Sequence, residues 1–235
     1  MSNSILIDGL RRALGLIFSG DARVYEAVSV SLWISCTATA LASALGLPLG
    51  FLVALKRFRG RETVITLLNT LLALPTVVVG LFIYALVRRG SFLGPADLLF
   101  SPWAMIIGQV VLAVPIVAAL GQTAVSSLDR AAQETALVLG ASRGRMLLTV
   151  AWEARFGVLA AIAAAGGRLI GEVGVSMMLG GNIEHHTRNL TTAIALETSK
   201  GEFAVAMALG LILMLLALGL NFLLRWLRGR GEVAS

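Results

Sequence analysis

Charge is scarce in this chain. Asp, Glu, Lys and Arg together make up 14% of its 235 residues, whereas soluble globular domains carry roughly 25% charged residues. Apolar residues account for 57% of the sequence. Because so little charge cannot cover so much apolar surface, we exclude an ordinary soluble globular domain.

Cysteine is scarcer still. Cys36 is the single cysteine of the sequence, so no disulfide can form within the chain. It lies inside a long apolar run, and we interpret it as a small packing residue. The adjacent residues His185 and His186 have no third ligand candidate nearby in the sequence, and we predict no metal site there.

Long apolar runs dominate what is present. Five runs carry no charge or almost none: residues 27–55, 63–87, 98–128, 156–183 and 203–224. A helix that rises 1.5 Å per residue needs about 20 apolar residues to cross the core of a bilayer. The runs therefore predict an all-α integral membrane protein with a transmembrane domain over residues 26–228. Its five spans are placed at about 28–55, 64–87, 101–126, 156–181 and 203–225.

Residues 1–25 precede the first span and show a different pattern. Leu6, Leu10 and Ile17 recur there at helical spacing, and Arg11 lies off their face. The charges also argue against a secretory signal peptide. The pattern predicts an amphipathic helix, which either lies in the membrane interface or packs against the bundle.

The lysines and arginines indicate which side of the membrane is cytoplasmic. Five spans place the termini on opposite sides, and more Lys and Arg residues flank the side that carries the 1–2 loop, the 3–4 loop and the C-terminus. This bias predicts an extracytoplasmic N-terminus and a cytoplasmic tail at 229–235. The net charge of +6 is spread over short loops, which gives no support to a nucleic-acid partner; the lipid bilayer is the expected partner.

The 3–4 loop holds a water-compatible amphipathic segment at residues 129–151. Ser127 or Asp129 can cap a first short helix. Gly140 stands where a glycine would end it, because glycine reaches positive φ without steric cost. Ser142 can cap a second helix. The pattern predicts a cytoplasmic helical hairpin that fits a cleft on a partner, with an ordinary interfacial loop as the alternative.

Part of this hairpin resembles the EAA loop of ABC importer permeases. Three residues separate Glu134-Thr135-Ala136 from Gly140, as in the family pattern Glu-Ala-Ala, three residues, Gly. The second half departs from the pattern, because Val150-Ala151-Trp152-Glu153 stands where Ile-x-Leu-Pro is expected. The resemblance implies the five-span core of the type I importer permeases, with coupling helices that dock on an ATP-hydrolysing subunit. The residues implied in ATPase coupling are Glu134, Thr135, Ala136, Gly140, Ala141, Ser142 and Arg143.

The sequence contains no P-loop for ATP. A Walker A motif requires Gly-Lys, but Lys56 follows Leu55 and Lys200 follows Ser199. We therefore expect the chain to be no enzyme, to have no catalytic residues and to bind no cofactor. ATP and magnesium are expected in a separate partner ATPase, although a passive channel would lack the motif as well.

Two opposite charges interrupt the fourth span near its middle. A charge at the bilayer centre costs about 2.5–3.5 kcal/mol on insertion scales, so Arg168 and Glu172 are expected to face the bundle interior or water. Their i, i+4 spacing places them on one helix face, but Arg before Glu is the weaker order for a pair within a helix. Pairing of one of them with another helix or a second subunit stays open. So does the choice between a packing bridge and a gate.

The surroundings of this pair are similar to those of oxyanion permeases. Molybdate and sulfate permeases carry a Gly-Glu-Phe-Gly stretch before Gly-Asn-Ile and Thr-Arg. Here Gly-Glu-Val-Gly ends at 174, Gly-Gly-Asn-Ile covers 180–183 and Thr-Arg covers 187–188. Residues 152–155 and 190–203 look most like the tungstate-type branch. The resemblance implies a homodimer of permeases, two ATPase subunits and an extracytoplasmic oxyanion-binding protein.

The hydrogen-bond donors of this region are compatible with an anion pathway. Backbone amides of glycine turns and helix starts, with Arg188 nearby, can receive a tetrahedral oxyanion. The candidates for the translocation pathway or its gate are Arg168, Glu172, Asn182 and Arg188.

The sequence thus predicts the permease subunit of an ATP-driven ABC importer in the plasma (inner) membrane of a prokaryote. The expected substrate is an oxyanion, with tungstate favoured, and the expected mechanism is alternating access. A molybdate or sulfate permease is the alternative within the same class. A self-contained channel or secondary carrier is the alternative outside it.

Overall fold

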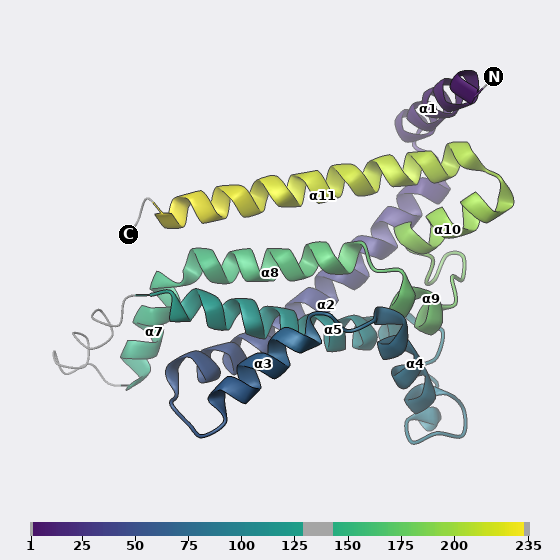
Figure 1. The fold of residues 1–235 in the computed structure, drawn as a ribbon. Helices are drawn as coiled ribbons and strands as arrows, with labels where there is room; N and C mark the ends of the chain where they lie inside the picture. The colour runs from purple at the N-terminus through teal and green to yellow at the C-terminus, as the bar shows by residue number, and fades with distance from the viewer. Residues whose placement is uncertain (1, 129–142, 233–235) are drawn as a thin grey trace. The chain divides into compact units, whose positions relative to one another are not determined.

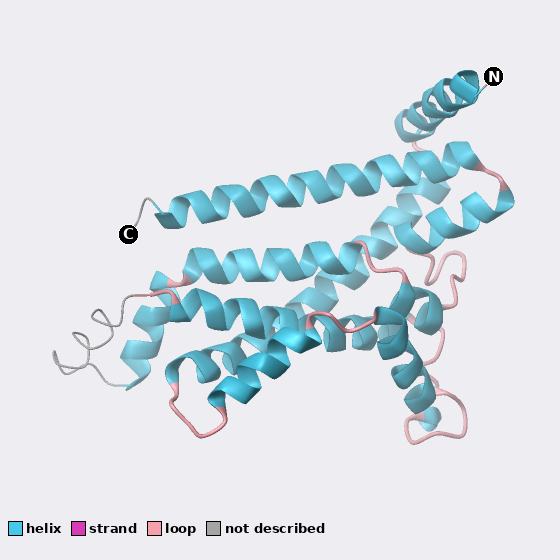
Figure 2. Cartoon of the chain, viewed as in Figure 1, coloured by secondary structure: helices cyan, strands magenta, loops and turns pink. Residues whose placement is uncertain are grey.

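Where the structure describes it, the chain is helical apart from its connecting loops (Figures 1 and 2). The structure is a computed structural model that describes residues 2–128 and 143–232, and these residues contain no strand. The all-α prediction is confirmed. The elements are α1 Ser2–Ser19, α2 Ala22–Leu55, α3 Arg61–Leu71, α4 Thr76–Val87, the 3-10 helix η1 Gly94–Ala96, α5 Pro102–Ser126, α7 Arg143–Glu153, α8 Arg155–Ile170, α9 Gly174–Gly180, α10 Leu190–Lys200 and α11 Phe203–Glu232.

Three of these helices, α2, α5 and α11, are long and apolar enough to cross a membrane. The pairs α3 with α4 and α8 with α9 bring the number of spans to as many as five, if each interrupted pair is counted as one. Two of the five predicted spans are therefore broken helices. This arrangement makes the chain a multi-pass membrane protein.

The first break has a visible cause in the sequence. Pro75 precedes α4 with φ −64° and ψ 118°, and it lacks the backbone N–H that a continuous helix would need. Pro48 and Pro115 lie inside α2 and α5, which continue past them. Membrane helices tolerate such prolines where neighbouring groups satisfy the freed carbonyls.

The chain divides into two compact units. One contains residues up to 38, 75–111 and 167–219, called unit 1; the other contains 39–74, 112–166 and the residues from 220, called unit 2. One hydrophobic cluster of unit 1 is formed by α1, the start of α2, α10 and the start of α11. Val24, Leu190 and Leu209 are among its buried side chains, none of them more than 1% exposed.

Within unit 1, α9 lies against both α4 and α5. A Cβ atom on Gly174 would lie 2.7 Å from Oγ1 of Thr76 in α4, and one on Gly180 would lie 2.5 Å from Sδ of Met105 in α5. At both contacts an added Cβ would force a neighbouring atom to shift, so glycine permits the close approach of α9 to α4 and α5. Small residues at helix interfaces are the usual means of close approach in membranes.

The N-terminal helix α1 has a packed side and an exposed side. Ala13 is fully buried, and Leu16 and Ile17 pack against the core of unit 1. Leu10 and Phe18 are exposed. Packing of the helix on the rest of the chain is thus part of its role, and placement of its exposed side in the membrane interface stays a prediction.

Unit 2 is built on close contacts between α2 and α5. A Cβ on Gly50 of α2 would lie 2.5 Å from the backbone oxygen of Ala118 in α5. At the other end of this contact, Val125 of α5 packs with Val150 and Ala154 around α7. The second helix predicted for the hairpin is present as α7. The predicted first helix and the turn at Gly140 lie outside the described residues.

Candidate functional site

A buried carboxylate organises the break between α8 and α9. The Glu172 side chain is 3% exposed, and its Oε2 accepts a hydrogen bond from Nη1 of Arg168 at 2.8 Å. Its Oε1 accepts the backbone N–H of Val175, at 3.2 Å, in the first turn of α9. One side chain thus connects the last turn of α8 to the start of α9. The partners of the two charges, which the sequence left open, are thus each other, and the pair forms across the end of a helix rather than along a continuous one.

The backbone of Glu172 is hydrogen-bonded as well as its side chain. Thr191, in the first turn of α10, donates from Oγ1 to the backbone oxygen of Glu172 at 2.8 Å. Asn189 caps α10 by accepting the backbone N–H of Thr192 at 2.9 Å, and the Asn189 N–H donates to Thr192 Oγ1 at 3.1 Å. This reciprocal capping fixes the start of α10. The backbone N–H of Leu190 donates to Oγ of Ser31 in α2 at 2.7 Å.

The loop between α9 and α10 has a constrained backbone. Gly181, Asn182 and His185 have φ values of 67°, 53° and 61°, in the left-handed region that residues other than glycine rarely adopt. Thr187 stabilises the loop, because its Oγ1 accepts the backbone N–H of Ile183 at 3.0 Å and donates to the backbone oxygen of Gly180 at 2.5 Å. Asn182 has a buried Oδ1 without a hydrogen-bond partner.

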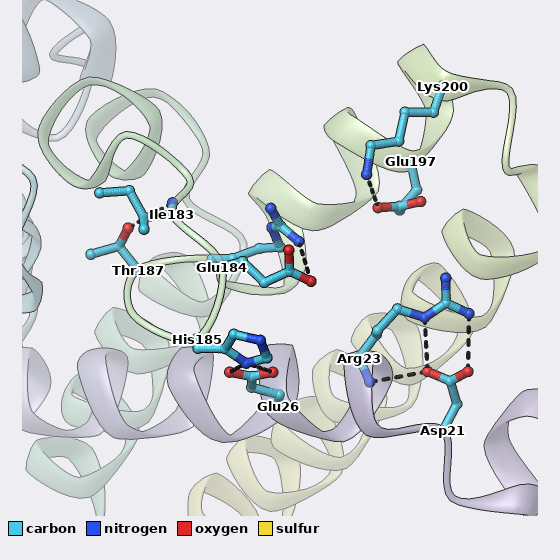
Figure 3. Close-up of polar contacts among 10 residues, drawn as sticks. Asp21, Arg23, Glu26, Ile183, Glu184, His185, Thr187, Glu197 and Lys200 are labelled. Carbon is cyan, nitrogen blue, oxygen red and sulfur yellow. Dashed lines mark hydrogen bonds and ion pairs between the residues drawn. The ribbon is translucent and has the colours of Figure 1, made fainter.

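Arg188 faces a cavity of about 180 Å³ in unit 1 that is lined by charged groups of both signs. Its Nη1 pairs with Oε1 of Glu184 at 3.2 Å, while its Nε is buried and has no partner. Across the same cavity, Nζ of Lys200 lies 3.0 Å from Oε1 of Glu197 (Figure 3). Arg23 and Glu26 complete the charged lining, and His185 lines the cavity as well.

Figure 3 also shows how this loop reaches the first span. Nδ1 of His185 lies 2.7 and 2.8 Å from the two carboxylate oxygens of Glu26 in α2. Close by, the guanidinium of Arg23 bonds the carboxylate of Asp21 at 3.0 Å. This hydrogen bond lowers the pKa of the Asp21 carboxyl below its ordinary value. The His185 side chain is 78% exposed, and its contact with Glu26 was not predicted from the sequence.

The structure brings the four pathway candidates into one unit but not into one cluster. Arg168 and Glu172 form the pair at the α8–α9 break. Asn182 and Arg188 belong to the loop after α9, and only Arg188 lines the charged cavity. In the described part of the chain, no three His, Cys, Asp or Glu side chains converge as metal ligands would.

Comparison with known proteins identifies the family of this chain. The family model for the "Binding-protein-dependent transport system inner membrane component" matches residues 46–230. The chain belongs to this family. It is 40% identical to the "Tungstate uptake system permease protein TupB" of Campylobacter jejuni over 93% of this chain and 91% of that protein. It is 36% identical to the protein of the same name from Peptoclostridium acidaminophilum, over 92% and 95% of the two chains.

Solved structures agree on the fold of this inner membrane component. An inward-facing MetNI methionine ABC transporter matches with a TM-score of 0.68, over 87% of this chain and 96% of that chain, at 18% identity. A bacterial alginate ABC transporter in complex with its alginate pentasaccharide-bound periplasmic protein matches with a TM-score of 0.69, over 94% and 86%, at 17% identity. The fold is that of the type I ABC importer permeases. As a permease subunit of such a transporter, the chain is not itself catalytic.

Most residues expected to couple this permease to an ATPase lie outside the described residues: Glu134, Thr135, Ala136, Gly140, Ala141 and Ser142. Arg143 is the first residue of α7. At the other end of α7, Arg155 donates from Nη1 to the backbone oxygen of Trp152 at 2.6 Å. Its guanidinium carbon also lies 4.8 Å from the Trp152 ring centre and 4.5 Å from that of Phe156. These contacts fix the turn between α7 and α8 where the Ile-x-Leu-Pro of the family pattern is missing.

Proposed function

We propose that this chain is the membrane-spanning permease of an ABC importer that takes up tungstate. The observation that carries the proposal is the 40% identity to the Campylobacter jejuni tungstate permease over nearly the whole of both chains. Relatives named for molybdenum are more distant, such as the putative permease of Bacillus subtilis at 27% identity over 78% of this chain. Tungstate is therefore favoured over molybdate and sulfate.

In this proposal the chain works by alternating access as part of a larger assembly. Two copies of the chain form the permease, two ATPase subunits bind ATP and magnesium, and an extracytoplasmic binding protein delivers the oxyanion. The hairpin at 129–151 docks on the ATPase through the coupling residues 134–136 and 140–143. Closure of the ATPase dimer then moves α7 and, through the turn held by Arg155, the spans that follow it. The N-terminus lies outside and the C-terminal tail in the cytoplasm.

Arg168, Glu172, Asn182 and Arg188 are proposed to act in the pathway or its gate. The Glu172 carboxylate holds together a broken span, and broken spans carry the substrate sites of many transporters. Arg188 has a buried Nε without a partner, so it retains a donor for an incoming anion. The buried Oδ1 of Asn182 has no partner, and because this oxygen can only accept, it would repel an anion; we therefore propose Asn182 for the gate rather than for contact with the anion.

Reconstitution in proteoliposomes tests the function. The permease is combined with the ATPase that co-purifies with it and with the binding protein, and internal tungsten is measured after ATP is supplied. Uptake is expected only when all three components and ATP are present. Tungstate flux through the permease alone would establish a channel or carrier and overturn the proposal. Competition by molybdate and sulfate then ranks the substrates of the complete assembly.

A second test addresses the coupling hairpin. Gly140→Pro removes a backbone N–H and fixes φ near −65°, so it should abolish association with the ATPase and uptake. Gly140→Asn serves as the matched variant, because asparagine tolerates the left-handed conformation expected at a helix C-terminus. It should retain most of the association. If Gly140→Pro leaves association and uptake intact, the docking assignment fails.

A further inference from the structure

Three helices of unit 2 end around one small hydrophobic cluster. Val125, in the last turn of α5, packs there with Val150 of α7 and with Ala154, which joins α7 to α8. Leu55, the last residue of α2, packs against the same cluster. Since α2 and α5 are long and apolar enough to span a membrane and α8 is part of a broken span, the common end of these helices marks one boundary of the apolar layer.

Positive charge gathers directly beyond this boundary. Lys56, Arg57 and Arg59 follow the end of α2, and all three are exposed. The loop that carries them is folded back on α2, because Nε of Arg61 donates to the backbone oxygen of Val53 at 2.8 Å. Figure 1 shows this loop between α2 and α3 at the same end of unit 2 as the turn between α7 and α8. The basic loop is thus held close to the end of the first span.

A further cation, Arg155, lies beside the same cluster at the start of α8. Its guanidinium is held against the rings of Trp152 and Phe156 and by the backbone oxygen of Trp152. A guanidinium carries five N–H donors in a planar fork that matches the oxygens of a phosphate. Because this side chain is already fixed, little conformational freedom is lost when an anion binds to it. The basic residues of this boundary, which we call the boundary cations, are Lys56, Arg57, Arg59 and Arg155.

Exposed apolar side chains accompany the boundary cations. Leu148 and Trp152 are 73% and 69% exposed, and their spacing of four residues places them on one face of α7. Phe58, in the basic loop, and Leu159, further along α8, are also exposed. Tryptophan and arginine are typical of the level of the lipid head groups, where one side chain contacts acyl chains and the other contacts phosphate. The apolar surface of this boundary therefore continues into the lipid-facing surface of a span.

The carboxylates of this boundary do not cancel its charge. Within the described part of the chain, Glu62 pairs with Arg61 at 3.0 Å, and Glu153 is exposed next to Trp152. The boundary cations outnumber Glu153. This excess favours an anionic partner, and its position at the end of three spans brings lipid phosphates within reach.

We propose that the boundary cations and Trp152 form a binding site for an anionic phospholipid. The lipid phosphate lies between the guanidinium of Arg155 and the basic loop, and the acyl chains follow Leu148, Trp152 and Leu159. A bound lipid would tie the end of α2 to the start of α8. It would thereby stabilise the segment that follows the coupling hairpin. The site does not depend on tungstate as the substrate, so it can fail or hold independently of the proposed function.

Lipid titration followed by native mass spectrometry tests the site. The full-length permease is purified in detergent with its ATPase, and phosphatidylglycerol or phosphatidylcholine with the same acyl chains is added. We expect tighter binding of phosphatidylglycerol. The double variant Arg57→Gln with Arg59→Gln should weaken its binding at least about tenfold, because each basic residue near an anionic lipid surface contributes about fivefold. The matched control is Arg88→Gln with Arg89→Gln, which removes the same charge from the loop after α4 and should leave the binding unchanged.

Two further measurements use the unmodified protein, so they do not depend on the folding of a variant. Raising the ionic strength from about 0.1 M to about 1 M shortens the Debye length from about 10 Å to about 3 Å, and the preference for phosphatidylglycerol should fall several-fold. Glycerol phosphate, which carries the phosphate without acyl chains, should not compete with the lipid. Competition by glycerol phosphate would show a site for a free phosphate instead, and a preference that salt leaves unchanged would contradict the role of the cations.

The aromatic part of the site has its own variant pair. Trp152→Ala removes the ring that holds the guanidinium of Arg155 and should weaken phosphatidylglycerol binding several-fold. Phe92→Ala is the matched control, since Phe92 is an exposed aromatic residue in the loop after α4, and it should bind the lipid as the wild type does.

Three outcomes would overturn the lipid site. They are equal binding of the two lipids by the wild type, unchanged binding in the Arg57 and Arg59 double variant, and an equal loss in the Arg88 and Arg89 control. If the double variant keeps its lipid but loses the ATPase, this face docks the ATPase and the inference fails as well.

Discussion

Glu172 bonds the guanidinium of Arg168 although the helix that carries Arg168 ends two residues earlier, at Ile170. The carboxylate therefore serves two helices at once, as the counter-charge of one and as a backbone acceptor for the other. A glutamate inside a continuous helix would find the backbone N–H groups of its own helix already bonded. The break in the span is what gives this carboxylate its second partner.

Replacing Glu172 should destabilise the protein more than replacing the exposed member of a similar pair. Glu172→Gln removes the charge that Arg168 bonds, and the free energy of unfolding should fall by about 1–2 kcal/mol. Glu184→Gln is the matched variant, since Glu184 also pairs with an arginine at i, i+4 but its side chain is 52% exposed. Its effect should stay within about 0.5 kcal/mol. Thermal unfolding of the purified complex measures both, and equal losses would contradict the structural role of Glu172.

Two glycine substitutions should act in opposite directions. Gly108→Ala forces a methyl group onto Val175 and Leu179, and such overpacking should cost about 1–3 kcal/mol. Gly210→Ala in α11 meets open space, and alanine in a helix interior should gain about 0.5–1 kcal/mol over glycine. Melting temperatures of the two variants, measured side by side, check the prediction. A melting temperature for Gly108→Ala at or above that of the wild type would show that the packing against α9 is looser than the structure indicates.

The role of Arg188 can be separated from that of its ion pair. Arg188→Gln should slow tungstate uptake at least about tenfold if the guanidinium attracts the anion, the loss of about 1.4 kcal/mol in the barrier. Glu184→Gln removes only the partner of the pair, and uptake should be kept. Initial rates of uptake at several tungstate concentrations provide the measurement. An equal loss in both variants would assign Arg188 to loop structure instead of the pathway.

Asp21 gives a prediction about pH. Its pKa is lowered by the hydrogen bond from Arg23, so its stabilising effect is fully present above the unfolded pKa of about 3.9 and is lost as the pH falls through the lower folded value. Asp21→Asn keeps an acceptor oxygen at the start of α2 but removes the charge. The variant should be less stable by about 0.2–1 kcal/mol at neutral pH. That difference should shrink below about pH 4, as followed by thermal unfolding; a difference that grows on acidification would contradict the assignment.

The helical fold was predictable because the low content of charged residues and the length of the apolar runs are sufficient to indicate membrane-spanning helices. The first break lies at Pro75, but Pro48 and Pro115 lie inside helices that continue past them, so a proline alone does not predict a broken span. The break at 171–173 was less visible, because glycines such as Gly171 and Gly174 are equally common where unbroken membrane helices pack closely. Their position around Glu172 required the contacts of α9 with α4 and α5, which no local pattern contains.

The spacing of Arg168 and Glu172 placed both on one helix face but left their partners open, and the structure pairs them with each other. Glu26 and His185 are separated by 159 residues, and no periodicity in the sequence relates them. The buried position of Gln109 could not be predicted for a different reason. This residue is uncharged, so it does not interrupt the third apolar run, and its lack of hydrogen-bond partners depends on the packed structure.

The two links between α2 and the loop before α10 have a consequence for biosynthesis. Glu26 with His185 and Ser31 with Leu190 each join residues 159 positions apart. At a translation rate of about 5–20 residues per second, the later partner is made about 8–30 s after the earlier one. The first span must therefore enter the bilayer and persist there before the groups that anchor its N-terminal half have been synthesised. If the ribosome stalls before residue 185, that half of the span lacks both hydrogen bonds, which distinguishes an incomplete chain from a complete one.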